Sequence, residues 1–186
     1  MPPSPAASEP RWLSPAERRV WIGWVMSTRV LWAELERDLQ RDAAMPFGYY
    51  DILVILSESP DRTRRMSELA DATQSSRSRL SHAISRLEAL GWIRRETCPG
   101  DRRGANAVLT DAGYAVLETA APHHVESVRQ HLFDQLSPEQ LAQLGEISER
   151  LLAHLLPLAS ARGDSTADLY EEAFHRLDAA EHGNVN

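Results

Sequence analysis

Residues 66–110 read MSELADATQSSRSRLSHAISRLEALGWIRRETCPGDRRGANAVLT, and this stretch decides the fold. It predicts a short helix, a polar turn and a longer second helix. In the second helix Leu80, Ile84 and Leu87 share one face because they are spaced by four and three residues. A serine of the turn can cap this helix, and Gly91 can end it by adopting a positive φ. Two helices joined in this way form a helix-turn-helix, whose second helix fits the major groove of DNA.

The other face of the second helix carries hydroxyl, guanidinium and imidazole groups. We expect Arg79 and His82 to read base edges, whereas the serines near the helix start suit phosphate. Arg86 has two open interpretations, a phosphate contact or an internal ion pair. The expected DNA contacts from the turn and helix are Ser75, Ser76, Arg77, Ser78, Arg79, Ser81, His82 and Arg86. Flanking phosphate contacts and simple solvation are both open for Arg62, Arg64 and Arg65.

Two β-favouring runs at 92–98 and 105–109 predict a hairpin after the second helix. Pro and Gly form the turn between them, and Arg102 and Arg103 are expected at its tip. A hairpin that projects arginine suits the minor groove, where narrow A·T segments concentrate negative potential. Asp101 is expected to orient Arg103 through a bidentate bond. A solvated, charged β-turn is the alternative, and the order of helix, turn and wing favours the DNA interpretation.

Several short patterns in this region occur together. They are Arg-Leu-Glu at 86–88, Gly91, Asp-x-Arg at 101–103, and Leu-Thr at 109–110 followed by Gly113. With these patterns the stretch resembles the winged helix-turn-helix of the multiple antibiotic resistance regulator (MarR) family. The resemblance implies a mainly α fold with a winged DNA-binding lobe, a helical dimerisation lobe and a small-molecule pocket between them. It further implies a homodimeric repressor that binds double-stranded DNA at a pseudo-palindrome and is released by an aromatic or carboxylate ligand.

The charge of the 186-residue chain is unevenly distributed. The formal net charge is −7, yet ten Arg and only five acidic residues lie between positions 62 and 104. DNA affinity depends on this local footprint, so the acidic total does not exclude nucleic acid. The single cysteine, Cys98, rules out an internal disulfide and fits a reducing compartment. Without a signal-like start or an apolar run of about 20 residues, we expect a cytoplasmic protein with no membrane partner.

The chain divides into four expected parts. Residues 1–13 form a mobile N-terminal segment, and 44–110 form the winged DNA-binding lobe. Segments 14–43 and 111–158 form the helical dimerisation lobe, while 159–186 is a tail with a possible short helix. The helices of the dimerisation lobe are expected from a capping box at Ser14 to about Asp42, from Asp111 with a bend at Pro122, and from a capping box at Ser137 to Pro157.

The effector pocket that the resemblance implies has aromatic candidates on the first two helices. Tryptophan at helical spacing also fits an ordinary core, so both interpretations stay open. The candidate ligand-binding residues are Trp24, Thr28, Trp32, Phe47, Tyr50 and Asp51.

Other functions have weaker support in the sequence. His123, His124 and His131 could form a pH sensor or a metal site, but their spacing fits ordinary, partly exposed histidines better. Cys98 beside arginines could sense redox state, although a packing thiol explains it as well. No phosphate loop, dinucleotide fingerprint or nucleophile elbow is present, so we expect no enzyme, cofactor or metal. A winged-helix module that binds protein remains the alternative class, and its surface should not be rich in arginine.

Overall fold

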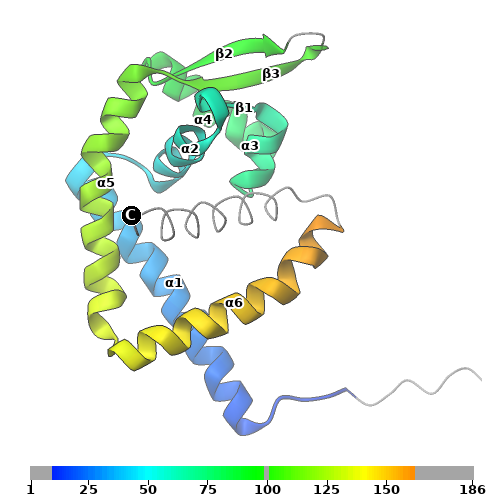
Figure 1. Cartoon of the computed structure of the whole chain (residues 1–186), viewed down its shortest axis with the longest axis vertical. Helices are drawn as coiled ribbons and strands as arrows, with labels where there is room; N and C mark the ends of the chain where they lie inside the picture. The colour runs from blue at the N-terminus through cyan, green and yellow to red at the C-terminus, as the bar shows by residue number, and fades with distance from the viewer. Residues whose placement is uncertain (1–9, 99–100, 162–186) are drawn as a thin grey trace, which may run out of the picture.

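The computed structural model describes residues 10–98 and 101–161, with the backbone alone described at Cys98 and 101–103. The expected fold, mainly α with a small β-wing, is confirmed (Figure 1). In chain order the described elements are α1 (Pro15–Ala43), α2 (Phe47–Glu58), η1 (Pro60–Arg62), β1 (Thr63–Arg65), α3 (Met66–Ala72), α4 (Arg77–Ala89), β2 (Ile93–Cys98), β3 (Asp101–Leu109), α5 (Asp111–His131), η2 (Phe133–Gln135) and α6 (Pro138–Ser160).

The predicted helix starts are confirmed by their capping hydrogen bonds. The Ser76 hydroxyl accepts from the backbone N–H of Arg79 at 3.3 Å and caps α4. Ser14 and Ser137 both form capping boxes, in which side chain and backbone satisfy each other across the first turn. Because these bonds satisfy backbone donors that the helix itself leaves free, they place the first residues of α1, α4 and α6.

The link between the sheet and α5 depends on a close approach of two backbone segments. The Thr110 hydroxyl accepts from Gly113 N at 3.0 Å and donates to the carbonyl of Gly91 at 2.7 Å. A Cβ atom on Gly113 would lie 2.2 Å from the carbonyl oxygen of Trp92, so only glycine fits. Gly91 has a φ of 76°, as predicted for the residue that ends the second helix.

The wing is a three-stranded antiparallel sheet in the order β1-β3-β2. The short strand β1 was not predicted, because three residues are too few to show a period. The predicted six-residue turn is wrong in one respect, since Asp101 pairs with Cys98 and 101–104 belong to β3. Arg102 and Arg103 therefore belong to β3, in the irregular stretch between the pairs Cys98–Asp101 and Thr97–Ala105, rather than to the tip of the turn.

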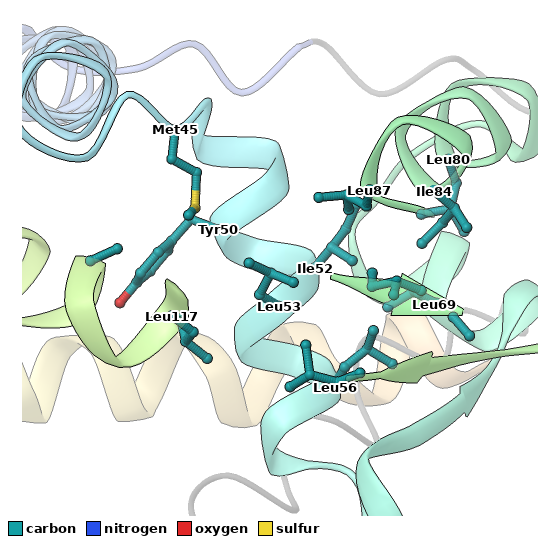
Figure 2. Close-up of a cluster of buried hydrophobic side chains, with 14 of the residues drawn as sticks. Met45, Tyr50, Ile52, Leu53, Leu56, Leu69, Leu80, Ile84, Leu87 and Leu117 are labelled. Atoms are coloured by element: carbon teal, nitrogen blue, oxygen red, sulfur yellow. The ribbon is translucent and has the colours of Figure 1, made fainter. Parts of the chain in front are cut away.

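A continuous apolar core joins the helix-turn-helix, the base of the wing and the first half of α5. Figure 2 shows this cluster around α2, with side chains from α3 and α4 on one side and Leu117 of α5 on the other. Its members include Leu53, Leu56, Leu69, Leu80, Ile84, Leu87, Ile93, Ala107 and Leu117. The apolar face predicted for α4 is the face that this core buries, which confirms the periodicity.

Two helices contain a proline at a position where the sequence predicted a bend or an end. α5 runs through Pro122 as one helix, because a proline removes one backbone bond without necessarily ending a helix. α6 continues past its predicted end at Pro157 to Ser160. The possible tail helix at 165–177 lies outside the described residues.

Among the residues that the structure describes, the apolar faces of α1 and α6 are largely exposed. None of the residues of α6 is buried. Ile147 is 53% exposed and Trp21 of α1 is 58% exposed. Within 10–98 and 101–161, each helix is too short or too polar to span a bilayer.

Candidate nucleic-acid interface

The outward face of α4 gathers most of the predicted DNA contacts. Leu80, Ile84 and Leu87 point into the core and are at most 2% exposed, so helical geometry turns the residues between them to solvent. The exposed members of the predicted set are Ser76, Arg77, Ser78, Arg79, Ser81, His82 and Arg86, and Ser75 is half-buried in the turn. Within 10–98 and 101–161, Arg86 forms no ion pair with a described residue, which leaves the phosphate contact as the interpretation that this part of the chain favours.

A groove of about 310 Å³ lies between the start of α4 and the base of the wing. It is lined by Arg65, Met66, Ser67, Arg77, Leu80, Gly104 and Ala105. Because its lining includes two arginines, the groove suits an anion such as a phosphate. The sequence pointed to Arg77 but not to the groove, because the groove forms between segments about 30 residues apart.

The side chains of the predicted wing contacts, Arg102 and Arg103, lie outside the described residues, as does the predicted bond from Asp101. The neighbouring arginines of β2 are described and both are engaged. Arg94 Nε donates to Glu96 at 2.8 Å, and Arg95 makes several bonds to α4.

The flanking arginines before α3 are also held within the chain. The Arg62 guanidinium lies 3.9 Å from the centroid of the Tyr114 ring and 3.1 Å from Asp111. Arg64 lies 3.9 Å from Glu68 and its side chain is 14% exposed. Arg62 therefore connects the segment before β1 to α5, and Arg64 connects β1 to α3.

Three of the candidate effector residues meet in one aromatic cluster. The ring of Phe47 lies 5.1 Å from that of Trp32 and 6.3 Å from that of Tyr50. His124 of α5 joins them, 4.7 Å from Tyr50, and its Nδ1 atom is buried without a hydrogen-bond partner among the described residues. Burial lowers the pKa of His124, which favours the neutral ring. Sequence reasoning did not connect His124 to this cluster, since α5 follows about 75 residues later.

The other effector candidates lie on α1 and α2, the helices that carry Trp32, Phe47 and Tyr50. Trp24 and Thr28 lie about two turns and one turn before Trp32 on the same face of α1, and the Thr28 hydroxyl donates to the carbonyl of Trp24 at 2.6 Å. Asp51 follows Tyr50 on α2, and burial raises the pKa of its carboxyl to about 6.

A buried polar junction between α1 and α5 was missed entirely. Asp38 Oδ2 accepts from the Ser127 hydroxyl at 2.6 Å and lies 2.7 Å from His131 Nε2, while Arg41 donates to Oδ1 at 2.7 Å. The Ser127 and His131 bonds lower the pKa of Asp38 to about 2. The sequence signal that could have revealed this junction is Asp38 itself, a carboxylate at the helical spacing of the buried residues Leu35 and Leu39. No cluster of metal-ligand type was found in 10–98 and 101–161.

The geometry defines a winged helix-turn-helix protein, and comparisons with known proteins agree. The model of the MarR family matches residues 45–104. The crystal structure of Sco3205, a MarR family transcriptional regulator from Streptomyces coelicolor in complex with DNA, is 53% identical, with a TM-score of 0.72 over 81% of this chain and 93% of that chain. AbsC, a second MarR family regulator from that organism, is 45% identical, with a TM-score of 0.70 over 78% and 98%.

A curated relative, the HTH-type transcriptional regulator PecS of Dickeya dadantii, is 34% identical over 90 residues, which are 48% of this chain and 54% of PecS. The chain therefore spans about half the length of the curated relatives that it matches. The long, near-complete match to Sco3205 is decisive for the family. This chain belongs to the MarR family of transcriptional regulators.

Proposed function

We propose that this protein regulates transcription by binding a pseudo-palindromic operator as a homodimer, with α4 in the major groove and the β2–β3 hairpin over the minor groove. The observation that carries the proposal is the exposed polar face of α4, where Arg77, Arg79 and His82 stand on a helix whose other face is buried. A helix presented in this way fits the width of the major groove. The Sco3205 relative, solved in complex with DNA, supports the same use of the fold.

Within this proposal the polar groups divide into two roles. Arg79 and His82 lie on the exposed face of α4 and read base edges. The serines at the helix start, Ser75, Ser76 and Ser78, bind DNA phosphates. Arg86 adds a further phosphate contact. The groove rimmed by Arg77 accommodates one backbone phosphate between α4 and the wing. Arg102 and Arg103, oriented by Asp101, reach the minor groove.

The dimer uses the uncovered apolar faces of the helical lobe. Leu141, Ile147, Leu151 and Leu155 follow one another along α6 and are each between 45% and 53% exposed. Removing such a stripe from water is favourable by about 25 cal/mol per Å², so a second copy of the same face is a suitable partner. Segments 14–43 and 111–158 form this lobe, and 44–110 form the DNA-binding lobe.

We further propose that a small aromatic or carboxylate effector releases the repressor from DNA. The cluster of Trp32, Phe47, Tyr50 and His124 lies where α1, α2 and α5 meet, so a molecule inserted there changes how the two lobes pack. A buried ring nitrogen that lacks a partner favours a ligand that offers a hydrogen bond. Trp24, Thr28 and Asp51 extend the site along α1 and α2.

Footprinting on the DNA upstream of the protein's own gene tests the proposal. We expect protection of two half-sites about one helical turn apart, and loss of protection when a bound aromatic acid also raises the melting temperature. Arg79→Ala should change base preference, whereas a uniform loss would assign Arg79 to phosphate. Trp32→Ala should weaken both effects of the acid. Absence of any protected site at low salt would contradict the proposal.

A further inference from the structure

Arg95 of β2 is bonded to the helix that presents the predicted base contacts. Its Nη2 atom donates to the carbonyl of Ser81 at 3.0 Å and to the hydroxyl of Ser85 at 2.9 Å. Its Nε atom lies 3.3 Å from Glu88 Oε2, and its backbone N–H donates to Glu88 Oε1 at 3.0 Å. The three partners follow one another along about two turns of α4. Arg95 of the wing therefore contacts α4 at several points along the helix.

The strand register shows that this contact has a counterpart on the other edge of the sheet. Arg95 lies opposite Ala107 of β3, and Ala107 lies opposite Arg64 of β1. Directly opposed residues of antiparallel strands project from the same face, so all three side chains point toward the helices. Arg64 pairs with Glu68 of α3, and Ala107 between the two arginines is fully buried. The sheet is thus joined to each helix of the helix-turn-helix by an Arg–Glu pair.

The pair on β2 lies where the wing loses its third strand. β1 pairs only with residues 106–108 of β3, so the remainder of the hairpin is a two-stranded arm that extends from the helices (Figure 1). Two-stranded ribbons are only marginally ordered by themselves. The position of the arm then depends on how firmly its base is held. Arg95 is one residue from the point where the three-stranded part ends, so a contact there controls the direction of the whole arm.

We propose that Arg95 and Glu88 are positioning residues that fix the angle between the wing and α4, so that both grooves of an operator are engaged together. This inference rests on the proposed function. The two side chains are 33% and 30% exposed, and ion pairs at such depth contribute little to global stability. Their effect is expected in DNA binding, because contacts at several points along α4 define an orientation.

The competing role for Arg95 is a direct contact with a DNA phosphate. The two roles predict opposite changes in DNA affinity for one substitution, Glu88→Gln. Glu88→Gln removes a negative charge near DNA while keeping an oxygen for the Arg95 amide. If Arg95 binds phosphate, Glu88→Gln releases the guanidinium and binding is unchanged or tighter. If Arg95 positions the wing, the arm loses its anchor and binding weakens by about tenfold, the size of a lost specific contact.

The experiment measures operator affinity and its salt dependence for the full chain and for Glu88→Gln. Glu96→Gln is the matched control, because it removes the same charge from neighbouring β2, where its partner Arg94 lies on the opposite face of the strand from Arg95. We expect binding by the control to be unchanged or slightly tighter. For Glu88→Gln the salt slope should also fall by about 1–2, since wing phosphate contacts are lost. Thermal unfolding of each variant checks that the lobe stays folded.

Two further variants keep the inference testable if Glu88→Gln unfolds the lobe. Arg95→Lys keeps the positive charge but loses the planar fork, so we expect the same weakening, whereas a plain phosphate contact would survive. Arg103→Ala should lower operator affinity less in the Glu88→Gln background than in the wild type. The reason is that an unanchored wing contributes little to binding. Wild-type affinity in Glu88→Gln or Arg95→Lys, or full additivity with Arg103→Ala, would overturn the inference. Failure of the unmodified protein to bind any operator would instead overturn the proposed function.

Discussion

The winged lobe and the helical lobe have the same kind of apolar periodicity but opposite burial. In α4, Leu80, Ile84 and Leu87 are at most 2% exposed, because α2, α3 and the sheet surround them. In α6, Ile147 and Leu151 are 53% and 45% exposed, although their spacing is equally regular. An apolar stripe therefore shows which face favours burial, but not which chain covers it. We infer that the winged lobe completes its core within one chain and that the helical lobe needs a second chain.

The largest effect should follow from charges placed on the uncovered face of α6. Ile147→Glu combined with Leu151→Glu replaces two apolar contacts of the proposed dimer and should raise its dissociation constant by at least about 100-fold. Sedimentation equilibrium measures this constant. Glu149→Gln, on the opposite side of α6, is the matched control and should leave it unchanged. If the wild-type protein is monomeric, the inference that the helical lobe needs a second chain is contradicted.

Replacing an isoleucine by alanine in each lobe should give melting temperatures that depend differently on protein concentration. Ile84→Ala should lower the free energy of unfolding by about 2–5 kcal/mol, because Ile84 is fully buried within the chain. Ile147→Ala should destabilise less, and its melting temperature should rise more steeply with protein concentration than that of Ile84→Ala. Calorimetry at several concentrations distinguishes them, and identical concentration dependence would count against separate cores.

Asp38 tests the buried junction between α1 and α5, which lies within the helical lobe. Asp38→Asn should destabilise by about 1–3 kcal/mol at neutral pH, since Ser127 and His131 lose a charged acceptor. The folded pKa of Asp38, about 2, lies below its ordinary 3.8, so its contribution is present above pH 4 and disappears as pH falls toward 2. Urea unfolding across this range should show the difference between wild type and variant narrowing. A constant difference would contradict the role of the charge.

Asp51 should give the smallest effect, and with the opposite sign. Burial raises its folded pKa to about 6 from an ordinary 3.8, so the folded state binds more protons and the wild type loses stability as pH rises from 4 to 6. Asp51→Asn should therefore stabilise by about 1 kcal/mol at pH 7, after allowance for partial solvent contact. The gain should be absent at pH 4. Equal gains at both pH values would point to packing instead of charge.

Local patterns predicted the elements of this protein, whereas distant contacts decided how its site is built. The α4 face, the Ser76 cap and the positive φ of Gly91 depend on neighbours a few residues away, so the sequence contained them. Asp38 meets Ser127 across 89 residues, and no period in either helix signals that meeting. The Arg95 contacts to α4 likewise depend on how the wing folds back, which only the assembled sheet defines.

The mass of the protein–DNA complex tests the central claim most directly. Native mass spectrometry with a duplex that carries the footprinted site should find two chains per duplex, and two chains in the free protein. With a duplex that carries one half-site, the affinity should fall sharply although the same α4 contacts are available. One chain bound per full duplex at undiminished affinity would contradict the claim that the helical lobe is completed by a second copy.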